Sequence, residues 1–350
     1  MAHFAQASRE QRRCLPVGAG WRAATPAADE WLLWSSAPYR DIRQWAADDL
    51  MVEAEAGLSV PELNQVLAAR GQWLPAGMPD GGPDTLGGLV GAGATGAWTG
   101  GYGPVRDRVL AMSVATPAYG VVRIGAPVVK NVAGYNLPRL YWGTGAVWGI
   151  VLAVTWKLAP WPRAVAVCET RWGHSEMEAA LAEADRCRRA VPVWASLVLT
   201  GKEDGWALTG VFHGGPAAAE RVCGVVDARL ASAGDIMGSE AFSAKVEWQA
   251  RVPVTHVPPV LQGVRARGWD VAAELQSGVI WGSGAGHDPD DMSWLARCVR
   301  ACGGVLRPFG RPPESLRVSG SDAALWRRLK AAVDPEGILP PLAGAGEGSP

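Results

Sequence analysis

The stretch DTLGGLVGAGATGAW, residues 84–98, spends five of its fifteen positions on glycine and three on alanine. Glycine clusters serve as flexible linkers, as faces for close packing, or as loops whose bare backbone surrounds a ligand phosphate. A linker is disfavoured because ordered segments with glycine motifs of their own lie on both sides. We therefore expect a ligand turn at residues 85–88, followed by a helix of small residues around Gly91, Gly93 and Gly96.

The length of the chain and the change in sequence pattern along it predict two domains. At 350 residues it exceeds what one hydrophobic core usually supports. The first half alternates short apolar runs with glycine turns, whereas clear amphipathic helices follow Pro160, Trp161 and Pro162. We expect a first domain at residues 1–162, a second at 163–343 and a disordered tail at 344–350.

Charge and hydropathy exclude several classes of function. A net charge of -1 and a pI near 6.5 argue against a nucleic-acid or polybasic membrane partner. The apolar run at residues 140–156 is shorter than the roughly 20 residues of a membrane span, so it predicts a buried strand and no transmembrane segment. The N-terminus has no apolar signal core, which predicts a cytoplasmic protein.

The cysteines do not predict a metal centre. All six are scattered, and only Cys298 and Cys302 are near neighbours, at the spacing of one helix face. Zinc and iron–sulfur sites need converging Cys or His ligands, so we expect free thiols and no metal.

Local patterns predict a mixed first domain. Residues 60–70 are expected to form a helix with Ser59 as N-cap and Gly71 as its stop. A helix is expected to close at residues 10–14, and strands are expected at 15–20, 50–57, 109–116 and 121–125. The order lacks the regular alternation of a Rossmann sheet, so the fold class is α+β.

The second domain is expected to combine strands and amphipathic helices. The expected strands are residues 164–170, 193–200, 206–213, 277–281 and 304–309. The expected helices are residues 176–189, 216–231, 292–302 and 323–333, the second of them from the spacing of Val222, Val226 and Leu230. The β-α-β-β-α order at its start predicts a ferredoxin-like half.

Four glycine-bearing segments in the first domain carry the chemistry. Neither GxxxxGK[ST] nor a GxGxxG between a strand and a helix with a later acidic residue is present, which disfavours P-loop and Rossmann proteins. The segments are VGAGWR (17–22), DTLGG (84–88), GGYGPVRD (100–107) and KNVAGYNLPRLYWGTGAVWG (130–149).

In order and spacing, these segments resemble the FAD-binding domain of the p-cresol methylhydroxylase or vanillyl-alcohol oxidase type. Within that superfamily the chain is most similar to the smaller of the FAD-binding subunits of bacterial glycolate oxidases. The family's TLGG and YGxxRD are literal at residues 85–88 and 102–107, and its KNVAGYD is nearly literal at 130–136. The resemblance continues through SGVIWG (277–282), GGVLRPF (303–309) and LKAAVDPEGILP (329–340).

The resemblance implies an FAD site. Two facing glycine turns can donate backbone N–H groups to a pyrophosphate without a lysine, and a helix starting after residue 85 would point its first amides at the same phosphates. The segments at 102–107 and 130–136 are expected beside the flavin. The expected cofactor-binding residues are Val17, Gly18, Ala19, Gly20, Trp21, Thr85, Leu86, Gly87, Gly88, Gly91, Tyr102, Gly103, Arg106, Asp107, Lys130, Asn131, Gly134, Tyr135, Asn136, Gly149 and Ile150.

The sequence also departs from the family pattern. Ala19 and Trp21 replace a glycine and a small hydroxyl residue, Asn136 replaces an aspartate, and Ala146 stands at a family glycine. No histidine or cysteine directly follows VGAGW or adjoins KNVAGYN, so non-covalent FAD is expected.

A catalytic site is not evident. Oxidation of a 2-hydroxy acid through a flavin needs a cation for the carboxylate and a base for the hydroxyl proton. The family's GDGN-x-H motif is absent, and the five histidines are isolated. Arg307 and Arg311 flank Phe309, where they could face the flavin or form surface ion pairs. Catalytic residues are therefore not assigned.

By resemblance, we expect an FAD-binding subunit of a glycolate oxidase-like complex that oxidises glycolate or a related 2-hydroxy acid. Its implied partners are a larger FAD-containing subunit, which carries the recognised catalytic motif, and an iron–sulfur subunit. Through them the protein would lie in the cytoplasm or at the periphery of the inner membrane. Two alternatives stay open: a stand-alone FAD-dependent oxidoreductase, and a cofactor-free scaffold, which Trp21 and Ala146 would favour.

Overall fold

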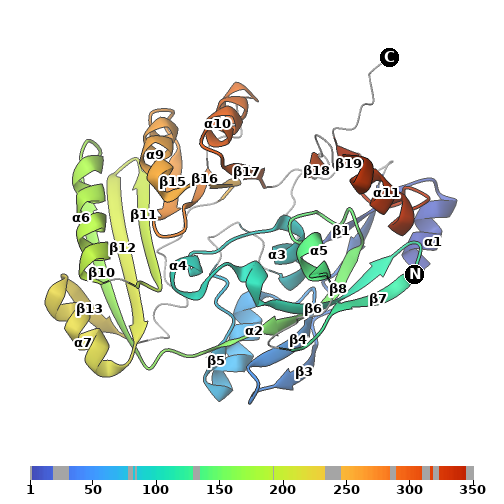
Figure 1. The fold of residues 1–350 in the computed structure, drawn as a ribbon, viewed down its shortest axis with the longest axis horizontal. Helices are drawn as coiled ribbons and strands as arrows, with labels where there is room; N and C mark the ends of the chain where they lie inside the picture. The colour runs from blue at the N-terminus through green and yellow to red at the C-terminus, as the bar shows by residue number, and fades with distance from the viewer. Residues whose placement is uncertain are drawn as a thin grey trace.

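The protein combines two sheets of different architecture (Figure 1). The computed structural model describes residues 2–18, 31–77, 82, 85–128, 135–191, 193–232, 246–283, 289–309, 316–317 and 323–343. A five-stranded sheet forms the centre of the first part, and an eight-stranded sheet forms the centre of the second. The mixed α+β architecture expected from the sequence is confirmed.

The chain begins with a helix and a small parallel sheet. Helix α1 (Ala2–Arg9) precedes β1 (Arg13–Val17), which pairs with β2 (Trp31–Ser35). The sequence placed the helix end at residues 10–14, but Gln11 has a φ of +52° and the Cys14 amide donates to the Ile338 carbonyl at 2.6 Å. The helix therefore ends at Arg9, and the strand starts earlier than expected.

The five-stranded sheet is antiparallel throughout, in the order β3-β4-β8-β6-β7. Its strands are β3 (Ile42–Ala46), β4 (Met51–Glu55), β6 (Val109–Thr116), β7 (Gly120–Gly125) and β8 (Ile150–Lys157). The shorter elements around it are β5 (Gln72–Trp73), paired with β9 (Ala159–Pro160), and the helices α3 (Leu86–Ala92), α4 (Thr99–Tyr102), η2 (Val105–Arg108) and α5 (Leu137–Tyr141).

Helix α2 (Val60–Leu67) has the caps that the sequence predicts. The Ser59 side chain accepts a hydrogen bond from the Glu62 amide, and the Glu62 carboxylate accepts one from the Ser59 amide, forming a capping box. The chain continues as η1 (Ala68–Arg70) and stops at Gly71, whose φ is +61°.

The eight-stranded sheet consists of two halves with the same connectivity. The first half runs β10 (Ala164–Trp172), α6 (Met177–Ala190), β11 (Ser196–Lys202), β12 (Gly205–Gly214), α7 (Pro216–Val225) and β13 (Ala228–Ala231). The second half runs β14 (Trp248–Arg251), η4 (Val254–His256), α9 (Val257–Arg265), β15 (Asp270–Glu274), β16 (Val279–Ser283), α10 (Pro289–Ala301) and β17 (Val305–Pro308). The strand order across the whole sheet is β13-β10-β12-β11-β15-β16-β14-β17, and the two halves join where β11 pairs with β15. In each half, counted from the outer edge of the sheet inward, the strands that come fourth, first, third and second along the chain follow one another.

Helices α6, α7, α9 and α10 pack on one face of this sheet, while its other face turns toward the first part (Figure 1). The helix expected at residues 216–231 is shorter in the structure. It ends at Val225, and residues 228–231 form the edge strand β13 against β10. Leu230 is exposed, so its apolar spacing with Val222 and Val226 does not mark one buried helix face.

Helix α11 (Ala323–Val333) returns to the first part, although the sequence grouped it with the second domain. Trp326 stacks on Trp148 with ring centroids 5.4 Å apart. Lys330 Nζ donates to the carbonyls of Val147 and Pro340, each at 2.9 Å. Strands β18 (Leu316–Arg317) and β19 (Leu342–Ala343) form a short parallel pair beyond β17. Residues 323–343 therefore complete the first part.

The two parts meet along residues 94–103. The Thr95 amide donates to Gln249 Oε1 at 2.9 Å, and Trp281 Nε1 donates to the Thr95 carbonyl at 3.2 Å. The Tyr102 hydroxyl lies 2.7 Å from His213 Nδ1. Among the residues that the structure describes, no helix combines the length and the apolarity that a membrane crossing requires.

The Tyr102–His213 contact predicts an acid-sensitive domain interface. Burial lowers the pKa of His213 from 6.5 to about 4. Between pH 6.5 and 4 the His213 side chain is protonated in the unfolded state but neutral in the folded state. Its contribution to the free energy of unfolding is therefore complete above pH 6.5 and is lost as the pH falls toward 4. We expect a loss on the order of 2 kcal/mol from this group.

The measurement is urea unfolding at pH 7.5 and 4.5 for the wild type and His213→Gln, which cannot titrate. Carboxylates titrate alike in both proteins, so the difference between their pH slopes reports His213. Equal slopes would contradict the prediction.

Candidate functional site

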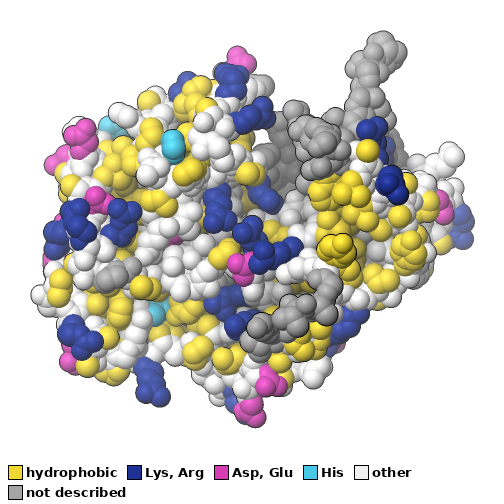
Figure 2. Space-filling view, viewed as in Figure 1, with side chains coloured by type: hydrophobic (Ala, Val, Ile, Leu, Met, Phe, Trp, Pro, Cys, Tyr) yellow, Lys and Arg dark blue, Asp and Glu magenta, His cyan; other side chains and the backbone are white. Residues whose placement is uncertain are grey.

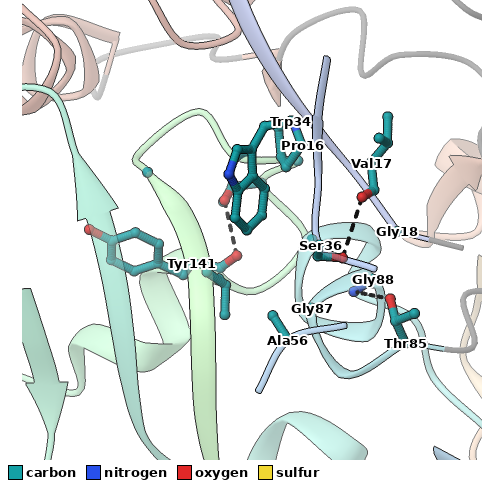
Figure 3. A pocket seen from close by; sticks show the side chains of 16 residues that line it. Pro16, Val17, Gly18, Trp34, Ser36, Ala56, Thr85, Gly87, Gly88 and Tyr141 are labelled. Atoms are coloured by element: carbon teal, nitrogen blue, oxygen red, sulfur yellow. Dashed lines mark hydrogen bonds between the residues drawn. The ribbon is translucent and has the colours of Figure 1, made fainter. Parts of the chain in front are cut away.

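A pocket lies between the end of β1, β2, α3 and the loop at residues 143–149 (Figure 3). The space between its walls is about 720 Å³ when the open mouth is counted. Glycines and small residues dominate its lining, which leaves backbone close to the pocket. The lining residues are Pro16, Val17, Gly18, Trp34, Ser36, Ala56, Thr85, Gly87, Gly88, Gly91, Tyr141, Thr144, Gly145, Ala146, Gly149 and Val151.

Two of the glycine turns that the sequence singled out meet in this pocket. Gly18 follows β1, and a Cβ on it would lie only 2.8 Å from Thr85 Oγ1. Thr85 is the N-cap of α3 and accepts a hydrogen bond from the Gly88 amide at 3.1 Å (Figure 3). The close approach explains why residue 18 has no side chain.

The first amides of α3 are already used by the protein. The Leu86 amide donates to the Leu58 carbonyl at 2.9 Å, and the Gly87 amide donates to the Ala56 carbonyl at 2.8 Å. The expectation that these amides point at phosphates was therefore wrong. They hold α3 against the segment that follows β4 instead.

The loop at residues 143–149 offers the backbone donors that α3 lacks. It is pinned to α3 by two hydrogen bonds, from the Gly143 amide to the Val90 carbonyl at 2.7 Å and from the Gly145 amide to the Gly91 carbonyl at 2.9 Å. The amides of Thr144 and Ala146, which alternate with these, make no hydrogen bond to any described residue. Thr144 and Ala146 are buried residues of the pocket lining, and unpaired backbone N–H groups in such a lining suit an anionic oxygen ligand.

Ala146 has an unusual backbone conformation in this loop. Its φ is +72°, in the left-handed region that favours glycine. This backbone conformation explains why the family has glycine at this position. Alanine adopts the same conformation, but with backbone strain.

Gly91 leaves one side of the pocket open. A Cβ at this position would meet no atom within 4 Å, whereas one at Gly87 would lie 2.8 Å from the Ala56 side chain. The two glycines thus serve different purposes, Gly87 for packing and Gly91 for ligand space.

Aromatic side chains that sequence reasoning missed line the pocket. Trp34 is buried and stacks on Tyr39 with ring centroids 5.4 Å apart, and burial raises the pKa of Tyr141. Thr144 Oγ1 donates to the Tyr141 carbonyl at 3.0 Å. The only sequence signal for the part of the lining around Tyr141 and Thr144 was the glycine pattern of residues 143–149.

The other predicted residues lie elsewhere. Tyr102 and Gly103 lie at the end of the segment where the two parts meet, and Arg106 and Asp107 follow it. Asp107 pairs with Arg139 at 2.7 Å and with Arg106 at 3.6 Å. Leu86 and Ile150 are buried, Tyr135 is 91% exposed, and Asn136 precedes α5. Ala19, Gly20, Trp21, Lys130, Asn131 and Gly134 lie outside the described residues.

Metal-ligating groups do not gather in the part of the chain that the structure describes. No set of three or more His, Cys, Asp or Glu side chains there could hold a metal ion.

Comparison with known proteins identifies the kind of domain that the N-terminal residues resemble. Residues 2–125 match the family described as an FAD binding domain. Over 127 residues the chain is 35% identical to the glycolate oxidase subunit GlcE of Escherichia coli (strain K12), a match covering 36% of each chain. Over 124 residues it is 33% identical to the mitochondrial D-lactate dehydrogenase [cytochrome] of Arabidopsis thaliana, covering 35% of this chain and 21% of that protein. The chain thus spans about a third or less of the length of these two relatives.

The fold has a counterpart over nearly the whole chain. A solved alkyldihydroxyacetonephosphate synthase superposes with a TM-score of 0.67 at 15% identity, covering 97% of this chain and 73% of that one. This likeness extends over both large sheets, whereas the match to the FAD binding domain family ends at residue 125. Residues 2–125 thus match an FAD-binding domain, about a third of the chain is similar to glycolate oxidase subunits and D-lactate dehydrogenases, and these matches support FAD as its cofactor.

Proposed function

We propose that this protein is the FAD-binding subunit of a glycolate oxidase-like complex and holds non-covalent FAD for the oxidation of glycolate or a related 2-hydroxy acid. The observation that carries the proposal is the pocket between the two glycine turns and the loop at residues 143–149, within an FAD-binding domain. Relatives of this domain are named as glycolate oxidase subunits and D-lactate dehydrogenases, which supports the substrate class.

The residues of the pocket suit a dinucleotide. The amides of Thr144 and Ala146 would donate to pyrophosphate oxygens, and the bare backbone of Gly18, Gly88 and Gly91 would let the phosphates approach. Trp34 and Tyr141 provide flat surfaces against which an aromatic ring packs. When bound, FAD supplies a hydride acceptor.

The proton acceptor is proposed to come from elsewhere. Among the described residues, the pocket lining contains no Asp, Glu, His or Lys, so that part of the lining offers no group of suitable pKa to take the hydroxyl proton. We therefore assign that step to a larger FAD-containing partner subunit, with an iron–sulfur subunit as electron acceptor. The complex would be cytoplasmic or peripheral to the inner membrane.

We further propose that the second part is a ferredoxin-like cap domain. Each half of its sheet has β-α-β-β-α-β connectivity and the strand order fourth, first, third, second, which supports this assignment.

The cofactor proposal is tested with the purified chain. We expect a two-band flavin spectrum, either as isolated or after adding FAD. A folded but colourless protein that cannot be reconstituted would contradict it. Anaerobic glycolate or D-lactate is then added with and without the partner subunits, and bleaching only in their presence would place the missing proton acceptor there.

Gly91→Leu should block FAD binding without unfolding the protein. Its side chain enters the open space of the pocket, and replacing a helical glycine by leucine favours the helix by roughly 0.5–1 kcal/mol. We expect an FAD dissociation constant at least about tenfold higher, measured by fluorescence titration, with an unchanged or higher Tm. Gly224→Leu is the matched control, because Gly224 is also helical and open but lies in α7. Equal FAD affinity in both variants would place the cofactor elsewhere.

Ala146→Gly should stabilise the protein. Removing Cβ relieves the left-handed backbone at φ +72°, which costs a non-glycine residue about 1 kcal/mol. Urea unfolding of the apoprotein should show a gain of about that size, reduced by the loss of a buried methyl group. A lower stability than wild type would mean that the methyl contact outweighs the strain.

A further inference from the structure

Arg307 is a cation from the second part that reaches into the first. It lies on β17, paired with Gln249 of β14, and its guanidinium extends between the loops that contain Gly93 and Gly143. A Cβ on either glycine would overlap Nη1 of Arg307. Gly93 and Gly143 are each two positions from a residue that lines the pocket, Gly91 and Gly145, so the guanidinium contacts the same two backbone segments that contribute to the pocket.

The charge of Arg307 is not neutralised by the described residues. Its only hydrogen bond to them runs from Nη1 to the Ala92 carbonyl at 3.1 Å, and none of their carboxylates lies within ion-pair distance. Nε and Nη2 have no protein partner there, yet they are not sealed from solvent. Two donors of the guanidinium fork therefore stay available to a ligand.

A second arginine reinforces this positive charge. Burial, and then the nearby charge of Arg106, lower the pKa of Arg307. Arg106 lies 3.6 Å from Asp107, but Asp107 also binds Arg139 at the shorter distance of 2.7 Å, so one carboxylate serves two cations. Figure 2 shows Lys and Arg side chains gathered across the middle of this face, between the two parts. Arg307 is largely buried and Arg106 is exposed, and two like charges near each other favour an anion between them.

We propose that Arg307, assisted by Arg106, binds the carboxylate of the 2-hydroxy acid substrate at the boundary between the two parts. The inference rests on the function proposed above, because that function supplies a substrate with a carboxylate beside its reacting carbon. The planar fork of arginine matches two carboxylate oxygens, which a lysine cannot do. Arg307 comes from the second part and Arg106 from the first, so the substrate would be held by both.

A structural role for Arg307 makes a different prediction. Ala92 ends α3, and an arginine that only caps this carbonyl stabilises the helix end without affecting any ligand. Loss of such a cap would lower the Tm and leave anion binding unchanged.

The experiment measures binding of oxalate, which resembles the substrate but has no oxidisable C–H bond. FAD-loaded wild type, Arg307→Gln and Arg307→Lys are titrated at constant ionic strength, with the shift of the flavin spectrum as readout. We expect about 10- to 100-fold weaker oxalate binding in Arg307→Gln, a smaller loss in Arg307→Lys, and the same FAD content in all three. Arg123→Gln is the control, because Arg123 pairs with Glu53 on the five-stranded sheet, and it should bind oxalate like wild type.

Other outcomes overturn the proposal. Loss of FAD from Arg307→Gln and Arg307→Lys, with wild-type oxalate binding after reconstitution, would identify the FAD pyrophosphate as the anion. A lower Tm with unchanged oxalate and FAD binding would leave only the helix cap. If Arg307→Gln does not fold, Arg307→Lys and Arg106→Gln must both weaken oxalate binding, or the proposal fails.

The test separates this inference from the proposed function. If wild type binds no FAD, the function proposal fails, while the rise in Tm that oxalate gives the apoprotein still reports on Arg307. An oxalate-induced rise of equal size in wild type and Arg307→Gln would then overturn the inference by itself.

Discussion

The candidate site depends on how the loop at residues 143–149 is fastened to α3. The amides of Gly143 and Gly145 bond to the carbonyls of Val90 and Gly91, and this alternation leaves the amides of Thr144 and Ala146 without a partner among the described residues. Backbones can approach this closely only where side chains are missing, which accounts for glycine on both sides of the contact. The pocket is therefore bounded by backbone held in place by other backbone, and the polar side chains of the lining play a secondary part.

The sequence predicted those features that local rules control. The capping box of Ser59 and Glu62 and the left-handed stop at Gly71 follow from short-range chemistry, and the helix formed as expected. The glycine turns at Gly18 and Thr85 were found because a bare backbone at a ligand leaves a compositional trace. The domain boundary near Pro160 stays a prediction; the last strand of the five-stranded sheet along the chain ends at Lys157, and the first strand of the eight-stranded sheet begins at Ala164.

Long-range pairing could not be predicted in the same way. Local rules direct the first amides of α3 at a ligand, but the carbonyls of Ala56 and Leu58 capture them, and nothing local signals that contact. Leu230 continues a helical apolar spacing, yet it lies on an edge strand because β10 offers a partner there. Trp34 and Tyr141 could not be foreseen in the pocket, since an aromatic residue in a strand or short helix is equally at home in a core.

Helix α11 has a consequence for the order of assembly. Its Lys330 bonds to the Val147 carbonyl and its Trp326 stacks on Trp148, so the loop that bounds the pocket is supported by a helix synthesised about 180 residues later. During translation the first sheet can pair and the second can fold, but the pocket lacks this support until α11 has left the ribosome. The loop that bounds the pocket therefore gains this support only after the polypeptide has been made through this helix.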